Sequence, residues 1–218
     1  MQREQLLDEA RILIDLVERK TTSLADSVMT LEAAEYADPG LFQRESSELF
    51  RNHAQFVGPS CMLPEPGDFY AFADTGIPIL VVRRQDRSLA AFVNICSHRG
   101  APLGEGCGHA KKSRMFSCPY HGWSYDLDGK LIGVPFGNEG FGELDRSTLG
   151  LRPLAVQEHD GFIFVMPNPE LSFDAAQLLA GIGATMSGFG MERYHLLGIK
   201  RVETAINWKL NMDTFHEF

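Results

Sequence analysis

The chain of 218 residues lacks the features of a protein that binds membranes or nucleic acids. It has no apolar run of about 18 residues, the length that a membrane-spanning helix needs. Its first residues, MQREQLLDEARILIDLVERK, have neither the apolar centre nor the cleavage site of a signal peptide. Positive charge is scarce, with 20 Lys and Arg against 29 Asp and Glu, which disfavours contact with a phosphate backbone. We therefore expect no membrane and no nucleic acid among its partners.

Cysteine is also scarce. The four cysteines are too few and too unevenly placed for a disulfide framework. Two of the four stand close to histidines at the spacing of metal ligands, which favours a metal site over a disulfide. Cys61 and Cys107 have no such histidine, and we interpret them as free, structural thiols. Free thiols are typical of a reducing compartment, so the sequence indicates a cytoplasmic protein.

The first quarter of the chain has a helical pattern. Apolar residues recur at helical spacing between residues 2 and 20, which predicts an amphipathic helix. A second, short helix is predicted for residues 40–52, introduced by Asp38 and Pro39.

From about Gly67 the pattern changes to short apolar runs between Gly, Pro and Asp turns. This alternation predicts antiparallel β-structure, and the spacing of the turns is typical of a small β-sandwich. The predicted strands are residues 69–72, 79–83, 89–94, 115–117, 123–125, 131–132, 154–159 and 162–166.

The last part of the chain follows a predicted linker, Pro167-Asn168-Pro169. A helix is predicted for residues 171–186, a long strand for 193–207 and the start of another helix from Asn211. The sequence thus indicates an α+β protein with three parts. These are an N-terminal helical segment (1–50), a β-sandwich domain (51–169) inserted between helical segments, and the beginning of a further domain (170–218).

Two mixed cysteine–histidine pairs stand out within the β domain. Cys96-Ser97-His98 and Cys118-Pro119-Tyr120-His121 each offer one thiolate and one imidazole, with nineteen residues between His98 and Cys118. Two irons bridged by two sulfides need four protein ligands, and two thiolates can hold one iron while two imidazoles hold the other. We therefore predict a 2Fe–2S cluster held by Cys96, His98, Cys118 and His121.

The residues next to these pairs suit a cluster. Gly100 and Gly122 have no Cβ to crowd it, and Pro102 and Pro119 stiffen the two loops. Zinc is the alternative for four Cys and His ligands, but a zinc site normally pairs like with like on each loop. The mixture of both types on each loop favours the cluster.

The two loops also resemble those of a known family. CSHRGAPL (96–103) and CPYHGW (118–123), with YDLDGKL (125–131) after them, are similar to the cluster loops of Rieske non-haem iron, ring-hydroxylating oxygenase α subunits. The similarity covers roughly residues 50–170, although the loop between the pairs is slightly longer than in the family. It implies a Rieske 2Fe–2S domain followed by a helix-grip-like catalytic domain, of which residues 170–218 would be the truncated beginning.

Other Rieske proteins remain as alternatives. Respiratory Rieske proteins carry a membrane anchor and a disulfide between the cluster loops, whereas here Tyr120 stands where the partner of Cys107 would be. A stand-alone Rieske ferredoxin-like electron carrier needs only the cluster domain, and this chain has further segments on both sides of it. A third alternative is a non-catalytic fragment with a binding or regulatory role.

The C-terminal segment NWKLNMDTFHEF (207–218) resembles the sequence that leads into the mononuclear iron site of the family. That iron is bound by two histidines and a carboxylate, which would follow residue 218, so mononuclear Fe(II) is expected only in the full-length protein. The resemblance implies that Glu217 bridges the two metal sites between neighbouring subunits, with Asp213 as a weaker candidate. In this register His216 is not an iron ligand.

The resemblance also implies a reaction. A ferredoxin or a flavin reductase would donate electrons, and the mononuclear iron would activate O₂ and oxidise a small organic substrate. The family implies an aromatic substrate, a role in aromatic hydrocarbon catabolism, and dioxygenation, monooxygenation or demethylation. It further implies a homotrimer or an α3β3 assembly. The 218-residue chain alone would be inactive as an oxygenase.

Overall fold

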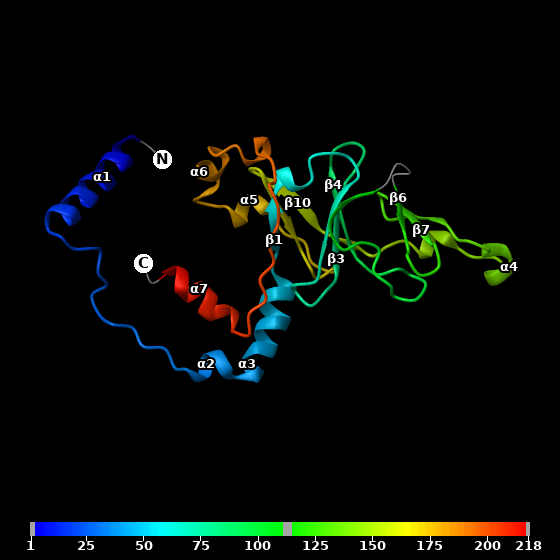
Figure 1. The fold of residues 1–218 in the computed structure, drawn as a ribbon, viewed down its shortest axis with the longest axis horizontal. Helices are drawn as coiled ribbons and strands as arrows, with labels where there is room; N and C mark the ends of the chain where they lie inside the picture. Colours follow the sequence, from blue (N-terminus) through cyan, green and yellow to red (C-terminus); the bar gives the residue numbers. More distant parts are fainter. Residues whose placement is uncertain (1–2, 111–114, 217–218) are drawn as a thin grey trace. The chain divides into compact units, whose positions relative to one another are not determined.

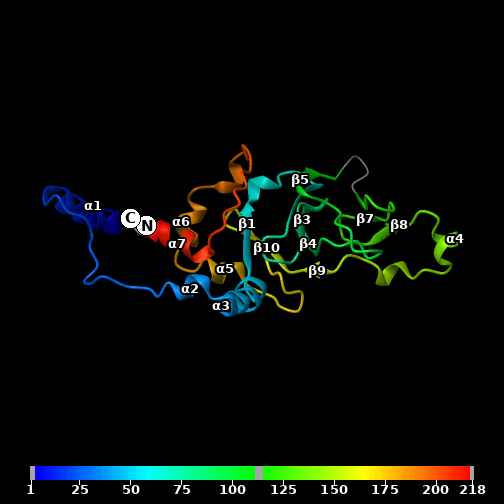
Figure 2. The same cartoon turned by 60° about the horizontal axis from the view of Figure 1, so that its bottom comes forward.

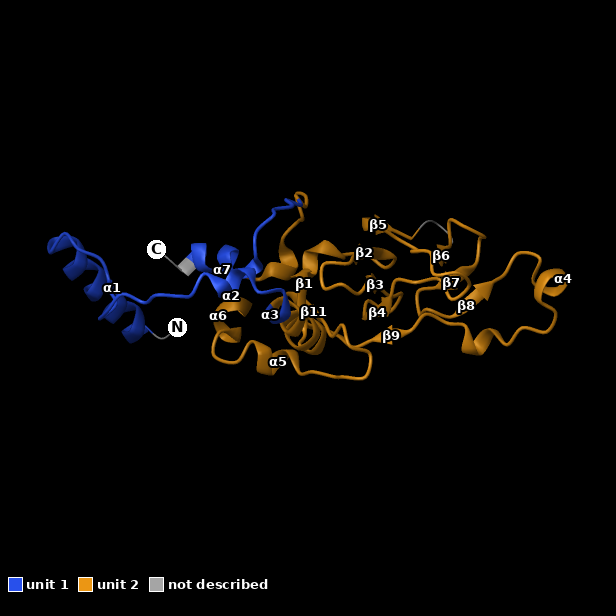
Figure 3. Ribbon diagram, turned by 90° about the horizontal axis from the view of Figure 1, so that it is seen from below, with its two compact units in different colours: residues 1–41, 201–218 blue, residues 42–200 orange. Residues whose placement is uncertain are grey.

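The computed structural model of the chain describes residues 3–110 and 115–216. It divides into two compact units, one made of residues 1–41 and 201–218 and one made of residues 42–200 (Figure 3). Among the described helices, none combines the length and the apolar character needed to cross a bilayer.

Unit 1 contains the helices α1 (Arg3–Glu18), α2 (Ala34–Ala37) and α7 (Trp208–His216) (Figure 1). The amphipathic helix predicted near the N-terminus is confirmed as α1. The helix predicted from Asn211 begins earlier, at Trp208, because the Asn207 side chain caps it by accepting a hydrogen bond from the Lys209 N–H at 3.0 Å. Asn207 also donates to the Tyr36 carbonyl at 2.9 Å, which joins the two ends of the chain that form this unit.

The helix predicted for residues 40–52 forms as α3 (Pro39–Arg44), which continues into a π-helical segment (Glu45–Phe50). Its start matches the sequence signal, because the Asp38 carboxylate accepts a hydrogen bond from the Gly40 N–H at 2.7 Å. The helix predicted for residues 171–186 is interrupted. It forms as α5 (Ala175–Leu178) and α6 (Gly183–Ser187), separated by Gly181 in a left-handed conformation (φ 89°).

The strands of unit 2 form three antiparallel sheets, which Figure 2 shows following one another along the unit. Their orders are β1-β11-β10, β5-β2-β3-β4-β9 and β6-β7-β8. The antiparallel β-structure predicted from the sequence is confirmed. The strands are β1 (Gln55–Pro59), β2 (Asp68–Phe72), β3 (Ile79–Arg83), β4 (Leu89–Val93), β5 (Gly106–His109), β6 (Met115–Ser117), β7 (Ser124–Asp126), β8 (Leu131–Gly133), β9 (Pro153–Leu154), β10 (Val156–His159) and β11 (Phe162–Val165).

Three details differ from the sequence prediction. β1 and β5 were not predicted, because neither has a clear apolar alternation. The single strand predicted for 154–159 is two strands, since the chain changes sheets there: β9 pairs with β4, and β10 pairs with β11. The long strand predicted for 193–207 is wrong, because only a 3-10 turn at Met191–Arg193 precedes irregular chain.

The central strand β3 is buried on both faces. Leu80 and Val82 pack into the core that contains Cys96 and Cys118, whereas Ile79 and Val81 pack into the core shared with Ile163 and Val165 of β11. A continuous apolar run is what a strand covered on both faces requires. The five-stranded sheet therefore lies between the β1-β11-β10 sheet and the two cysteine loops. The Pro167-Asn168-Pro169 segment lies within unit 2 and does not separate the two units.

A partly buried ion pair ties these layers together, in which the Arg83 side chain is buried and the Glu158 side chain is one-third exposed. Arg83 of β3 donates two hydrogen bonds to Glu158 of β10, at 2.5 and 3.0 Å, and its Nε donates to the Leu63 carbonyl at 2.8 Å. Burial raises the pKa of the Glu158 carboxyl. The hydrogen bonds and the charge of Arg83 outweigh that effect, so its pKa lies below the ordinary 4.5. The charged form is therefore the one that stabilises the fold.

We expect the substitution Glu158→Gln to lower the free energy of unfolding by about 1–2 kcal/mol at neutral pH, since solvent screens the charge of Glu158, whose side chain is one-third exposed. Because the folded pKa is depressed, the loss should be complete above about pH 4.5 and shrink as the pH falls further. Urea unfolding at several pH values measures this. The matched control is Glu170→Gln in the exposed pair with Arg152, which should change stability by less than about 0.5 kcal/mol. Equal losses of stability in both variants would contradict the role of the Arg83–Glu158 pair.

Candidate iron–sulfur site

Two loops bring the predicted ligands into one region of unit 2. The first loop follows β4, and the second joins β6 to β7. Cys96 and Cys118 are buried in the same core, while His98 is half-buried and His121 is exposed. The imidazole rings of His98 and His121 have centroids 4.6 Å apart. The structure thus brings both pairs together, with the thiols inside and the imidazoles toward the surface.

The backbone of the first loop is folded around Cys96. The Cys96 N–H donates to the Ala101 carbonyl at 2.8 Å, and the Gly100 N–H donates to the Cys96 carbonyl at 2.9 Å. Gly100 closes this turn in the left-handed region (φ 76°), where a side chain would be strained.

The second loop repeats the arrangement around Cys118. The Cys118 N–H donates to the Trp123 carbonyl at 2.7 Å, and the Gly122 N–H donates to the Cys118 carbonyl at 2.9 Å. Gly122 is left-handed as well (φ 72°). The two loops therefore hold their cysteines in the same way, although His98 follows Cys96 by two residues and His121 follows Cys118 by three.

Tyr125 of β7 is fully buried beside the first cysteine. Its hydroxyl accepts a hydrogen bond from the Ser97 N–H at 3.0 Å and lies 3.3 Å from the Cys96 sulfur. Burial, together with the contact to Cys96, raises the pKa of Tyr125 to about 12, so the hydroxyl keeps its proton. The protonated hydroxyl can donate a hydrogen bond to a thiolate, which is the form of cysteine that binds metal.

The donor atoms fit a 2Fe–2S cluster. His98 Nδ1 is buried and, in the described part of the chain, has no hydrogen-bond partner, as expected for an atom that binds iron. Burial, with the charges of His121 and Arg99, lowers the pKa of His98, which favours the neutral imidazole that ligates metals. Within the residues described, no three Cys, His, Asp or Glu side chains gather around one point. A binuclear cluster does not need such a group, because each iron receives two protein ligands.

The first loop depends on a residue that sequence reasoning did not single out. Asn94 is buried, accepts a hydrogen bond from the Leu103 N–H and donates to the Gly104 carbonyl, both at 2.9 Å. It ties the end of β4 to the far side of the loop. A buried amide of this kind has no sequence signal, because one asparagine between two apolar residues is equally typical of a turn.

Other residues predicted from the sequence lie elsewhere. Glu217 is outside the described residues. Asp213 lies on α7 and accepts a hydrogen bond from the Tyr36 hydroxyl at 2.6 Å within unit 1. Cys61 is buried and Cys107 is exposed on β5, and both are free thiols, as the sequence indicated.

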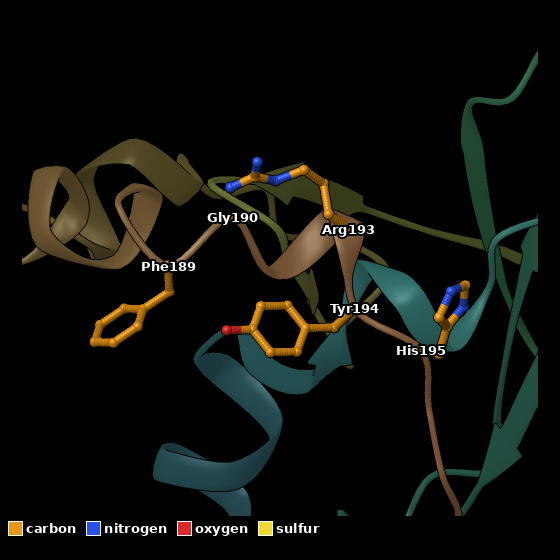
Figure 4. A pocket seen from close by; sticks show the side chains of 5 residues that line it. All are labelled: Phe189, Gly190, Arg193, Tyr194 and His195. Carbon is orange, nitrogen blue, oxygen red and sulfur yellow. The ribbon is translucent and has the colours of Figure 1, made fainter.

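An open pocket of about 400 Å³ is lined by Phe189, Gly190, Arg193, Tyr194 and His195. Figure 4 shows the Tyr194 ring between Phe189 and His195 in that view. None of its lining residues belongs to the two cysteine loops. The pocket is therefore separate from the candidate site.

Comparison with known proteins agrees with this geometry. The family model described as Rieske [2Fe-2S] domain matches residues 53–152. The glycine betaine monooxygenase oxygenase subunit of Chromohalobacter salexigens is 34% identical over 84% of this chain and 40% of its own length. The carnitine monooxygenase oxygenase subunit of Escherichia coli K12 is 32% identical over 86% of this chain and 50% of its own.

The fold has relatives among solved structures. A crystal structure of the quaternary ammonium Rieske monooxygenase CntA with an inhibitor superposes with a TM-score of 0.78 and 28% identity, over 88% of this chain and 53% of that one. The chain spans about half the length of the curated relatives that it matches.

We expect Tyr125→Phe to lower the reduction potential of the cluster by about 30–60 mV, because it removes a hydrogen bond that favours the more negative, reduced form. Redox titration followed by visible absorption measures the shift. The control is Tyr70→Phe, whose ring packs in the other core against Phe72. A potential that stays unchanged in Tyr125→Phe would show that the hydroxyl does not act on the cysteine sulfur.

Proposed function

Since this chain belongs to the family of Rieske non-haem iron oxygenase α subunits, we propose that it is the electron-transfer part of such an oxygenase. The chain carries a Rieske [2Fe-2S] domain, and related oxygenases hold a mononuclear iron in a further, catalytic domain. In the proposed function, electrons from a ferredoxin or a flavin reductase pass through the Rieske domain to that iron. The similarity to oxygenase subunits extends beyond residues 53–152 on both sides, which favours an oxygenase over a stand-alone carrier.

The proposed ligands are Cys96 and Cys118 for one iron and His98 and His121 for the other. The observation that carries this assignment is the buried Nδ1 of His98, which has no partner among the described residues, together with two buried thiols whose loops make the same backbone turn. When bound, the cluster supplies one-electron transfer. The residues nearby then have two roles. The turns closed by Gly100 and Gly122 hold the two cysteines, and Tyr125 donates a hydrogen bond to Cys96.

Glu217 is the proposed link between the cluster and the iron of an adjacent subunit. A carboxylate that accepts hydrogen bonds from a cluster histidine and an iron histidine would shorten the path for the electron and couple it to a proton. This role needs the assembled, full-length protein, for which we propose a homotrimer or an α3β3 complex.

The substrate class is proposed from the relatives. Relatives that match more than four-fifths of this chain include proteins named for glycine betaine, carnitine and anthranilate, so aromatic compounds are only one of the classes concerned. We propose that the full-length protein oxidises a small organic substrate with O₂ in a further, catalytic domain. A panel of candidate substrates for the full-length protein should include both quaternary ammonium compounds and aromatic acids.

The ligand assignment predicts the metal content of variants. We expect the wild-type chain to hold two irons and two acid-labile sulfides, and Cys118→Ala or His121→Ala to lose most of both, because each removes one of four ligands. Cys107→Ala is the matched control, as this exposed cysteine should be dispensable. Iron and sulfide analysis of anaerobically purified protein measures the outcome. Full iron content in Cys118→Ala would overturn the assignment.

The proposed relay predicts a second result. With NADH and a suitable reductase, the 218-residue chain should be reduced but form no product from any member of the panel. In the full-length protein, Glu217→Gln should slow product formation by about 10- to 100-fold and leave cluster reduction unchanged. Asp213→Asn is the control and should have a small effect. Product formation by the 218-residue chain would refute the proposal that oxygen activation belongs to a further domain.

A further inference from the structure

The short helix α4 (Gly137–Phe141) brings one aromatic side chain against a proposed cluster ligand. The ring of Phe141 meets that of His98 edge-on, with centroids 5.6 Å apart and an angle of 88°. It meets Trp123 in the same way, at 5.6 Å and 80°. His98 and Trp123 are stacked at 4.8 Å with only 8° between their planes. His98, Trp123 and Phe141 thus form an aromatic triangle in which each ring contacts the other two.

The backbone conformation on both sides of α4 positions Phe141 in this triangle. Figures 1 and 3 show α4 at one end of unit 2, beyond β7 and β8. Phe136 precedes the helix in the left-handed region (φ 53°), which is rare for a phenylalanine, and Gly142 follows it with φ 63°. The Gly142 N–H donates to the Asn138 carbonyl at 3.3 Å and ends the helix directly after Phe141. Strained backbone of this kind persists where the surrounding structure holds it, and it is frequent beside functional sites.

The members of the triangle differ in burial. Trp123 is 3% exposed and belongs to the core, whereas Phe141 is 44% exposed. A phenyl ring that only filled the core would be buried. The position of the Phe141 ring against His98 therefore indicates a role other than core packing. Edge-to-face contacts with two rings fix its orientation, and the ring in turn limits the rotation of the imidazole and the access of water to it.

We propose that Phe141 is a positioning residue that holds the imidazole plane of His98 against Trp123 and keeps water away from that side of the ligand. This inference rests on the proposed assignment of His98 as a ligand. Its consequence is electrostatic. The reduced cluster carries one more negative charge than the oxidised one, and water stabilises the more charged form. By excluding water, Phe141 lowers the reduction potential.

The test compares four variants of the 218-residue chain with a reconstituted cluster. Phe141→Ala opens the site, Phe141→Leu keeps an apolar side chain without a ring, and Phe141→Tyr restores the ring. The control is Phe136→Asn, at the residue directly before α4. Phe136 is 81% exposed and, among the described residues, makes no ring contact with His98, and asparagine tolerates its left-handed backbone. Redox titration gives the potential, and pulsed EPR of the reduced cluster gives the nitrogen couplings of the histidine ligands and the access of D₂O.

We expect Phe141→Ala to raise the ratio of reduced to oxidised cluster at a fixed potential by up to about tenfold, which is about 59 mV for one electron. Phe141→Leu should shift the potential less but change the nitrogen couplings, because the imidazole is freer to turn. Phe141→Tyr and Phe136→Asn should match the wild type in both measurements.

Two results would overturn the inference while leaving the proposed function intact. One is a full cluster in every variant with the potential and couplings of the wild type. The other is loss of the cluster in Phe141→Leu, which would assign Phe141 to assembly and not to positioning. A wild-type chain without iron and sulfide would instead refute the ligand assignment, and the inference with it.

Discussion

The candidate site depends on two backbone turns, each closed by a hydrogen bond from a left-handed glycine to a cysteine carbonyl. Gly100 and Gly122 make this bond to Cys96 and Cys118, and in both loops the cysteine N–H is bound five residues further along the chain. A turn of this shape buries the thiol and leaves the following histidine near the surface. Everything proposed about the cluster, including which side of it faces solvent, follows from this repeated geometry.

The rest of unit 2 supports these turns in layers. The five-stranded sheet is covered on one face by the core that includes both cysteines, and on the other by the β1-β11-β10 sheet. The Arg83–Glu158 pair ties the two sheets together, while Asn94 and Tyr125 satisfy polar groups beside the first loop. Polar groups buried so close to a metal site are stable only when each has a partner, so they also fix the loop in one conformation. The aromatic triangle of His98, Trp123 and Phe141 extends this rigidity to the solvent side.

Much of this arrangement was predictable from the sequence. The strands with strong apolar patterns, such as residues 79–83 and 162–166, form nearly where they were predicted, because burial on both faces of a strand leaves a continuous apolar run. The two cysteine–histidine pairs were identified because ligand spacing is a local property. Contacts between distant residues leave no such signal. Phe141 follows Trp123 by eighteen positions and Glu158 follows Arg83 by seventy-five, and only the folded chain brings them together.

The sequence predictions that were wrong also have physical causes. Residues 193–207 alternate in polarity without forming a strand, because a strand also needs a partner strand, and no described strand pairs with this segment. The helix predicted for 171–186 is broken because Gly181 allows the chain to leave the helical region. The expectation of an aromatic substrate came from the family resemblance, whereas the relatives found by comparison also include oxygenases named for glycine betaine and carnitine.

Mössbauer spectroscopy of the oxidised, iron-57-labelled chain tests the central claim most directly, because it distinguishes iron bound by thiolates from iron bound by imidazoles. The arrangement described here predicts two distinct iron sites of equal intensity, one for Cys96 and Cys118 and one for His98 and His121. A single class of iron, or a protein that binds zinc in place of iron, would contradict it.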